Sequence, residues 1–254
     1  MGRLAFDHTT PRCMTDNRDH GAKLLSLAVH EFRTPVSVVA GYLRMLLRHF
    51  GDTLTDQQRK LVEESEKSCG SLAGLLNELS DLASLEAGPS SLRRECVDLA
   101  PILTQLARDV HEGEDRGITL EVQRCDERAQ VLGDPVRLAS ALMTLVTAAI
   151  RERSEPTSMM AVCRVADTPD GRILRIAIAE QETIDTILTS PGEGTFDEYR
   201  GGLGFRLVLA SRIIAAHGGR IATPIAERGY LAVVVSLPAA PEPEPAALPC
   251  VRVA

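Results

Sequence analysis

The chain has 254 residues and a formal net charge of -7, with 44% hydrophobic and 25% charged residues, so it is long enough to bury the cores of two globular domains. The acidic balance, with no Lys/Arg-rich block, argues against a nucleic-acid-binding surface. No segment is apolar over the length of a membrane span, and the polar segment 1–20 is expected to be flexible and not a signal peptide. The six cysteines are scattered without CxxC spacing, which predicts reduced thiols in the cytoplasm and no metal site.

Apolar periodicity predicts a helical hairpin over residues 21–88. One helix is expected from about Lys23 to Phe50, and a second one, capped by Thr55, runs to about Glu86. Because two such helices cannot bury two apolar stripes alone, a dimeric four-helix bundle is the expected assembly. A coiled-coil-like seam is predicted along the second helix from residues spaced three and four apart: Cys69, Leu72, Leu76, Leu79 and Ala83.

Helices and strands alternate beyond the breaker segment 87–91, which predicts a second domain over residues 89–238. Residues 181–200 are expected to form a long loop. Residues 239–254, rich in Pro, Glu and Ala, are expected to be a disordered tail. Helices are predicted over 98–112, 135–150 and 203–217, and strands over 118–122, 160–165, 173–179 and 231–237.

The most informative segment is His30-Glu31-Phe32-Arg33-Thr34-Pro35, which lies inside the first predicted helix. The imidazole of His30 can accept a phosphoryl group, Glu31 can act as a general base, and Thr34 can position a water molecule. Thr34 lies one helical turn from His30, so the two side chains share a face. Pro35 is expected to kink the helix beside this site, because it lacks a backbone donor and clashes with the preceding turn.

This string resembles the phosphoacceptor box of two-component sensor histidine kinases. The order of elements after residue 88 resembles the ATP-binding domain of that family, an α/β sandwich shared with Hsp90, gyrase and MutL. The resemblance covers residues 23–238 and implies an α+β chain, with a dimerisation and phosphoacceptor hairpin followed by the sandwich. It also implies that ATP and Mg²⁺ serve to phosphorylate His30, which then passes the phosphoryl group to an aspartate of a response-regulator receiver domain.

The family's metal-binding residues are changed in this chain. By alignment, Ala148 stands where the resemblance implies a Mg²⁺-binding asparagine, and Thr144 stands where a second asparagine often lies. Alanine offers no oxygen, whereas Mg²⁺ prefers near-octahedral oxygen coordination. Thr144 lies one turn earlier on the same face and could hold a water molecule on the metal.

The adenine-side string is also altered. Glu180-Gln181-Glu182-Thr183-Ile184 stands where the resemblance implies Asp-x-Gly-x-Gly, whose Asp receives the adenine amino group. Glycines at these positions let the backbone approach the ligand closely, and this chain carries side chains there instead. Glu182 also adds negative charge to a site that would bind the phosphates of the nucleotide. Gly201, Gly202 and Gly204 resemble the second glycine string, whose amides meet phosphate at a helix N-terminus. Thr144, Glu180 and these glycines are therefore the candidate nucleotide-binding residues.

Three functions remain open on these residues. The first is a histidine kinase that uses Mg-ATP to phosphorylate His30. The second is a phosphotransfer or phosphatase module that exchanges phosphoryl groups between His30 and receiver aspartates, with Thr34 orienting water, and takes its phosphoryl group from a partner kinase. The third is a non-catalytic regulator, a pseudokinase scaffold that needs neither ATP nor His30.

Overall fold

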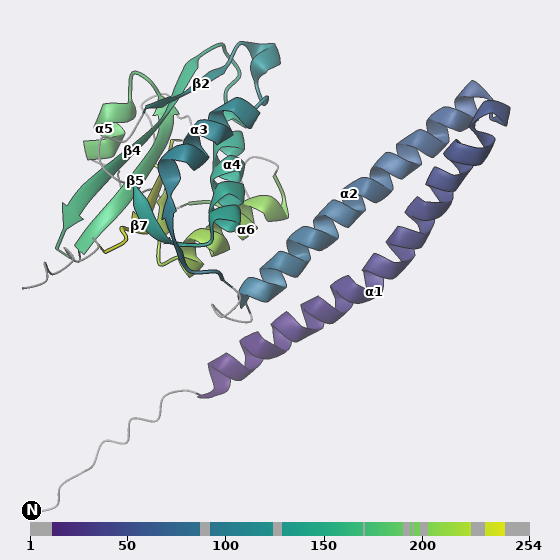
Figure 1. The fold of residues 1–254 in the computed structure, drawn as a ribbon, viewed down its shortest axis with the longest axis horizontal. Coiled ribbons are helices and arrows are strands. Elements are labelled where there is room, and N and C mark those ends of the chain that lie inside the picture. Colours follow the sequence, from purple (N-terminus) through teal and green to yellow (C-terminus); the bar gives the residue numbers. More distant parts are fainter. Residues whose placement is uncertain are drawn as a thin grey trace, which may run out of the picture. The chain divides into compact units, whose positions relative to one another are not determined.

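The computed structural model describes residues 12–86, 92–123, 129–169, 171–189, 194, 196–198, 203–224 and 232–241, with only the backbone for 12–19. The chain divides into two compact units, Met1–Ser91 and Leu92–Ala254, which are described one at a time. The first is a helical hairpin and the second an α/β sheet domain (Figure 1), so the expected α+β class is confirmed.

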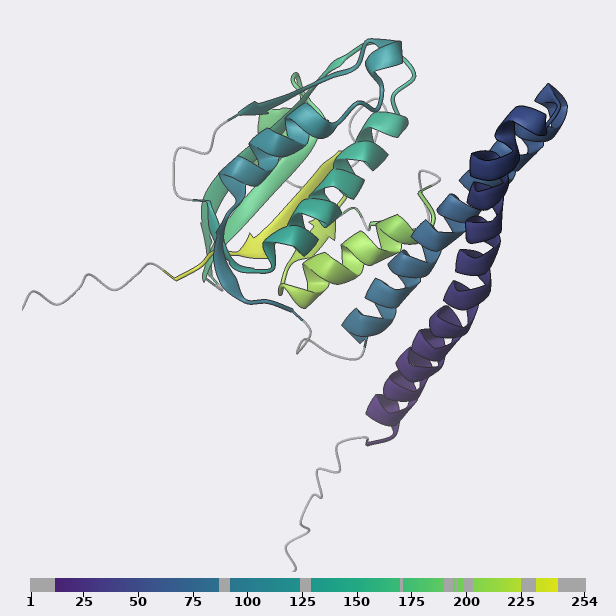
Figure 2. The ribbon, with the colours of Figure 1, turned by 45° about the vertical axis from the view of Figure 1, so that its right-hand side comes forward.

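The hairpin consists of α1 (Arg12–Phe50) and α2 (Asp56–Glu86), joined by the short 3-10 turn η1 (Gly51–Thr53). The two helices run side by side in opposite directions (Figures 1 and 2). The α1 helix begins earlier than the expected start near Lys23, inside the segment that was expected to be flexible. It also continues through Pro35, and the kink expected there stays a prediction.

The turn between the helices is fixed by hydrogen bonds that the sequence partly predicted. The backbone amide of Leu54 donates to the carbonyl of Phe50 at 3.1 Å. Thr55 and Gln58 form a reciprocal capping box, in which the Thr55 amide donates to Oε1 of Gln58 at 3.0 Å and the Gln58 amide donates to Oγ1 of Thr55 at 3.3 Å. The predicted role of Thr55 as the cap of the second helix is confirmed.

The seam of the hairpin is narrower than the sequence pattern indicated. Cys69, Leu76 and Ala83 are buried on α2, and Ala22 and Val29 are buried on α1. Leu72 remains 49% exposed, so it lies outside the part of the seam that is buried within one hairpin, and its place in a dimeric seam stays a prediction.

The second unit is built on a five-stranded sheet in the order β2-β4-β5-β7-β6. Its strands are β2 (Thr119–Gln123), β4 (Ser158–Thr168), β5 (Gly171–Glu180), β6 (Arg220–Ala222) and β7 (Val233–Pro238). The β2 and β4 strands are parallel, and the other pairs are antiparallel. A separate two-stranded ribbon pairs β1 (Glu95–Asp98) with β3 (Gln130–Gly133).

Three helices cover one face of this sheet: α3 (Leu99–Asp109), α4 (Pro135–Arg151) and α6 (Phe205–Ala216) (Figures 1 and 2). The α4 helix starts where Asp134-Pro135 predicted, with the Asp134 carboxylate accepting from the amides of Val136 and Arg137, each at 3.1 Å. The α6 helix ends as predicted at Gly218, which has φ 73°. The main core lies between these helices and the sheet, with fully buried Leu138, Leu142, Leu145, Leu174, Ile176 and Ile178.

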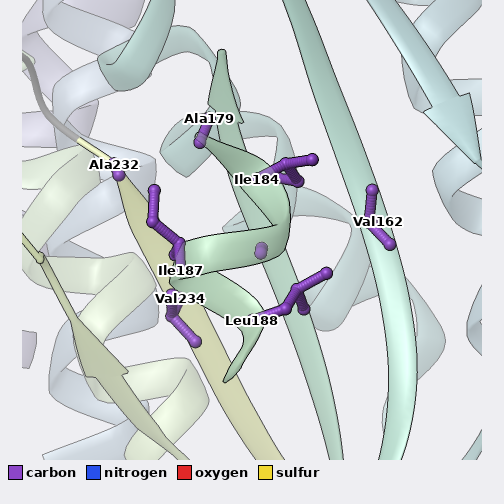
Figure 3. Packing of buried hydrophobic residues seen from close by; sticks show 8 residues of the cluster. Val162, Ala179, Ile184, Ile187, Leu188, Ala232 and Val234 are labelled. Carbon is purple, nitrogen blue, oxygen red and sulfur yellow. The ribbon is translucent and has the colours of Figure 1, made fainter. Parts of the chain in front are cut away.

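The opposite face of the sheet carries the short helix α5 (Ile184–Thr189), which the sequence had assigned to a long loop. Its Ile184, Ile187 and Leu188 are buried (Figure 3). They pack against small side chains that leave room for them: Val162, Ala177, Ala179, Ala232 and Val234. The loop assignment failed because a helix of six residues is too short to show a periodic pattern.

Two arginines of the sheet hold α5 at its ends. Arg164 on β4 places Nη2 3.1 Å from Oδ1 of Asp185, in the first turn of the helix. Arg175 on β5 donates from Nη1 to the backbone carbonyl of Leu188 at 3.3 Å, near the last turn. A cation at the C-terminal carbonyls also matches the helix dipole. Among the described residues, no helix is both long enough and apolar enough to cross a membrane.

Candidate functional site

His30 projects into solvent from the middle of α1. Its side chain is 78% exposed, although the preceding residue, Val29, is buried in the seam. Its charged neighbour along the chain is Glu31, whose Oε1 lies 3.8 Å from Nδ1 of His30. This distance is too long for a hydrogen bond but short enough for electrostatic interaction with the ring. Glu31 therefore lies on the Nδ1 side of the imidazole, which leaves Nε2 as the nitrogen facing an incoming group.

Thr34 is exposed one turn further along α1, on the face of His30. Arg33, beside it, reaches across the hairpin and donates from Nη2 to Oδ1 of Asn77 on α2 at 3.1 Å. Sequence reasoning had not selected Arg33 or Asn77. A cation three residues after His30 was visible in the string, but the partner on α2 depends on the register of the hairpin.

The candidate nucleotide residues lie in the second unit, and their surroundings differ from what a Mg²⁺ site needs. Ala148 is 1% exposed and belongs to the buried side of α4. The hydroxyl of Thr144 donates to the carbonyl of Ser140 at 3.0 Å, one turn earlier in the same helix. Its proton is thus committed to the backbone. Neither position presents the carboxylate or amide oxygen that Mg²⁺ prefers.

Glu180, at the end of β5, is already engaged by a side chain of the protein. Nε of Arg153 lies 3.2 Å from Oε1 of Glu180, and the two side chains are 2% and 14% exposed. Arg153 follows the C-terminus of α4, and Arg116 donates to its backbone carbonyl. Sequence reasoning missed Arg153, because it lies far from Glu180 along the chain and only the packing of α4 against β5 joins them.

The residues after Glu180 fold back on the sheet. The amide of Thr183 donates to the Glu180 carbonyl at 3.0 Å, and the Thr183 hydroxyl lies 3.2 Å from the same oxygen. This turn leads directly into α5. The segment that replaces the expected glycine string therefore forms a closed turn and a helix packed on the sheet.

Gly204 is the N-cap of α6, with φ 57°, and among the described residues beyond its chain neighbours no atom lies within 4 Å of the position that a Cβ would take. Gly201 and Gly202 lie outside the described residues. Within the described parts of the chain, no group of three His, Cys, Asp or Glu residues could hold a metal ion. Among the described residues, Ala148 and the Arg153–Glu180 pair do not fit Mg-ATP held in the manner that the sequence resemblance implies.

Comparison with known proteins agrees with the geometry of the hairpin. Residues 22–88 match the model of the His Kinase A (phospho-acceptor) domain. The sensor histidine kinase GacS of Pseudomonas protegens is 29% identical over 215 residues, which cover 79% of this chain and 23% of the relative. The circadian input-output histidine kinase CikA of Synechococcus elongatus is 27% identical over 206 residues, covering 78% of this chain and 27% of the relative.

Solved structures share the fold. Full-length ShkA in complex with AMPPNP has a TM-score of 0.62 at 24% identity, over 85% of this chain and 45% of that one. The Acinetobacter baumannii histidine kinase AdeS has a TM-score of 0.51 at 18% identity, over 82% of this chain and 97% of that one.

A hairpin that matches the phospho-acceptor domain, followed by an α/β sheet domain, is the arrangement found in two-component histidine kinases. The domain match and these relatives support that family for this chain, a family that normally uses ATP and Mg²⁺. The chain spans about a quarter of the length of the two curated relatives.

Proposed function

We propose that His30 accepts a phosphoryl group and passes it to the aspartate of a response-regulator receiver domain. The observation that carries this proposal is the exposure of His30, 78% of its side chain, beside Glu31 on an unbroken helix that matches the phospho-acceptor domain. An exposed imidazole can be reached by the active site of a second protein, and a buried one cannot.

The chemistry follows from the ring geometry. Nε2 of His30 attacks the phosphorus, the bond from phosphorus to the donor breaks, and an Nε2–P bond forms. Glu31, on the Nδ1 side, stabilises the positive charge that develops on the ring and accepts the Nδ1 proton. In the second transfer a carboxylate oxygen of the receiver attacks phosphorus and Nε2 leaves. Thr34 is positioned to orient a water molecule for hydrolysis of the receiver phosphoryl group.

We also propose that the phosphoryl group enters from a partner and not from ATP bound to this chain. Two features of the sheet domain support this choice. Ala148 offers no metal ligand, and Glu180 is paired with Arg153 instead of being open to a base. Loss of the charge neutralisation that Mg²⁺ provides should lower the rate of phosphoryl transfer from ATP by orders of magnitude.

The hairpin is proposed to dimerise into a four-helix bundle. Five apolar side chains of α1 lie within about 60° of one another around the helix, at about 100° per residue, and each is about half exposed or more. We call this set the α1 stripe: Leu24, Leu27, Val38, Tyr42 and Met45. On α2, Leu61, Leu72 and Leu75 share a face in the same way. A second copy of the hairpin would bury both sets.

The experiment that tests the proposal measures label on His30 under two conditions. Purified protein is incubated with labelled Mg-ATP alone, and then with a phosphorylated receiver domain as the donor, with His30→Ala as the control. Label that appears only from the receiver, and only in the wild-type chain, supports phosphotransfer. His30-dependent label from ATP alone would show a working kinase, and no label from either source would favour the non-catalytic regulator.

A further inference from the structure

The hydrogen bond between Arg33 and Asn77 holds a cation that comes from the position three residues after His30 on α1. Nη2 of Arg33 donates to Oδ1 of Asn77 at 3.1 Å, and the two residues come from different helices. Such a bond between two exposed side chains adds little to stability, because water competes for both groups. Its value is that it restricts a long, flexible side chain to one region of the surface.

Helix geometry brings this cation toward His30. At about 100° per residue, Arg33 lies about 60° from His30 around α1, on the side of the buried Val29, and Thr34 lies about 40° from His30 on the other side. Side chains on a helix lean toward its N-terminus, so both residues point back toward the level of the imidazole. The histidine is thus flanked by a guanidinium on one side and a hydroxyl on the other.

A guanidinium has five N–H donors, and the bond to Asn77 uses one of the two on Nη2. The remaining donors have the planar arrangement that suits phosphoryl oxygens. A phosphoryl group on Nε2 would bring almost two negative charges to a site where the nearest carboxylate, Glu31, repels it. A positive charge one turn away offsets that repulsion.

We propose that Arg33 binds the phosphoryl group on His30 and that Asn77 is the positioning residue that holds Arg33 in place. This inference rests on the proposed function, because it requires His30 to carry the phosphoryl group. It assigns a role to α2 in the chemistry of a histidine on α1, and it makes the register of the hairpin a determinant of phosphohistidine stability.

The test loads His30 chemically and thereby avoids any need for a kinase. Phosphoramidate serves as donor: its P–N bond breaks, the bond from phosphorus to the ring nitrogen forms, and ammonia leaves with the ring proton as ammonium. The ³¹P NMR shift of the phosphohistidine is then followed between about pH 5.5 and 9, which covers the second ionisation of a phosphoryl group near pH 6. A neighbouring cation favours the dianion and lowers this pKa.

The expected order is a phosphoryl pKa lowest in the wild-type chain, higher in Asn77→Ala, and highest in Arg33→Met, with a total rise of roughly half a unit to one unit. Arg33→Lys keeps the charge and should restore part of the difference. The matched control is Arg44→Met, because Arg44 is exposed on the same helix and donates from Nε to the carbonyl of Ala40 at 3.3 Å. It should leave the pKa at the wild-type value.

If the Arg33–Asn77 hydrogen bond only stabilised the hairpin, its loss would change the melting temperature but would leave the pKa of the phosphoryl group unchanged. An unchanged pKa in Arg33→Met, or an equal rise in Arg44→Met, overturns the role of Arg33. A rise in Arg33→Met with no change in Asn77→Ala overturns the role of Asn77. A chain in which phosphoramidate leaves no signal dependent on His30 would instead contradict the proposed function, and the inference would fall with it.

Discussion

Nε of Arg153 lies 3.2 Å from Oε1 of Glu180, and this ion pair joins the end of α4 to the end of β5. Glu180 is the carboxylate that sequence resemblance assigned to the adenine amino group. In the structure its charge is met by a buried guanidinium of the same chain. The Arg153–Glu180 pair therefore explains how the negative charge of Glu180 is balanced without a bound nucleotide.

Removing one partner of the pair should destabilise the sheet domain. Arg153→Met leaves Glu180 without its counter-charge in a site that is 14% exposed. We expect a loss of about 3 kcal/mol in the free energy of unfolding, the lower end for a broken buried pair, because Glu180 keeps some contact with water. Urea denaturation followed by circular dichroism measures this change.

The control for this prediction is Arg164→Met, which removes a 3.1 Å ion pair with Asp185 between side chains that are 50% and 81% exposed. An exposed pair contributes about 0–1 kcal/mol, so the effect should be much smaller. If the two variants lost the same free energy of unfolding, burial would not be the reason that the Arg153–Glu180 pair matters for stability. In the double variant Arg153→Met/Glu180→Gln, much of the lost stability should return.

Restoring the expected asparagine should not restore a kinase. Ala148→Asn places an amide at a position that is 1% exposed, so it should cost roughly 1–3 kcal/mol unless the amide finds partners. The Arg153–Glu180 pair and the closed turn at Thr183 remain in place. Incubation with labelled Mg-ATP should give no label above that of the His30→Ala control. Strong autophosphorylation by this single variant would falsify the assignment.

Thr34→Ala should separate two activities of the hairpin. The threonine hydroxyl can orient water for hydrolysis of a receiver phosphoryl group, but it is not needed for attack by His30. We expect receiver dephosphorylation to slow on the order of 10- to 100-fold while phosphoryl acceptance at His30 stays near the wild-type rate. Time courses with a phosphorylated receiver measure both.

Ser37→Ala is the matched control for Thr34, since Ser37 is a second exposed hydroxyl on α1. It should change neither rate. If Thr34→Ala slowed acceptance and dephosphorylation by the same factor, a general disturbance of the hairpin would be the better explanation.

The dimer prediction concerns the α1 stripe. Val38→Glu and Tyr42→Glu each place a charge in the surface that a second hairpin would cover, so either change should shift the protein toward monomer. Sedimentation equilibrium over a range of concentrations measures the shift. Arg48→Glu changes charge on the same helix away from the stripe. Retained self-association in both stripe variants, together with loss in the control, would place the interface elsewhere.

His111 gives a local pH dependence in the sheet domain. Its Nδ1 lies 2.8 Å from Oε1 of Glu114, and the hydrogen bond to this carboxylate, helped by its charge, raises the pKa of His111 above 6.5. A raised pKa means that the stabilising contribution is fully present below pH 6.5 and is lost as the pH rises through the folded-state value. NMR titration of the imidazole should show this raised pKa.

Glu114→Gln removes the carboxylate and should lower the pKa of His111 toward 6.5. The effect on stability should be small, because both side chains are largely exposed. A His111 titration that is unchanged in Glu114→Gln would show that the contact does not persist in solution.

The elements with strong local signals could be predicted from sequence. Thr55 and Asp134 cap helices where their side chains and spacing indicated, and Gly218 ends α6. The candidate phosphoacceptor residues could be selected because His30, Glu31 and Thr34 are neighbours along one helix. The short elements were missed, since β1, β3, β6 and α5 contain few residues and are held by packing and edge pairing rather than by a periodic pattern.

The partners within the sites could not be predicted. Arg153 meets Glu180, and Asn77 meets Arg33, only after helices and strands have packed. Each contact joins residues that are distant along the chain, and no local rule specifies the register that brings them together. The sequence therefore indicated which residues had changed, and the packed structure was needed to find what had taken their place.

The α1 helix is continuous from Arg12 to His30. The direction of His30 around the helix axis is therefore fixed relative to the N-terminal end of the helix. Each residue inserted between those points would turn the upstream end by about 100° relative to His30, and seven residues would return it to within about 20°. A rotation imposed upstream would be transmitted along the same rod. The direction in which the His30 side chain points around the helix axis therefore depends on how the N-terminal end of α1 is oriented.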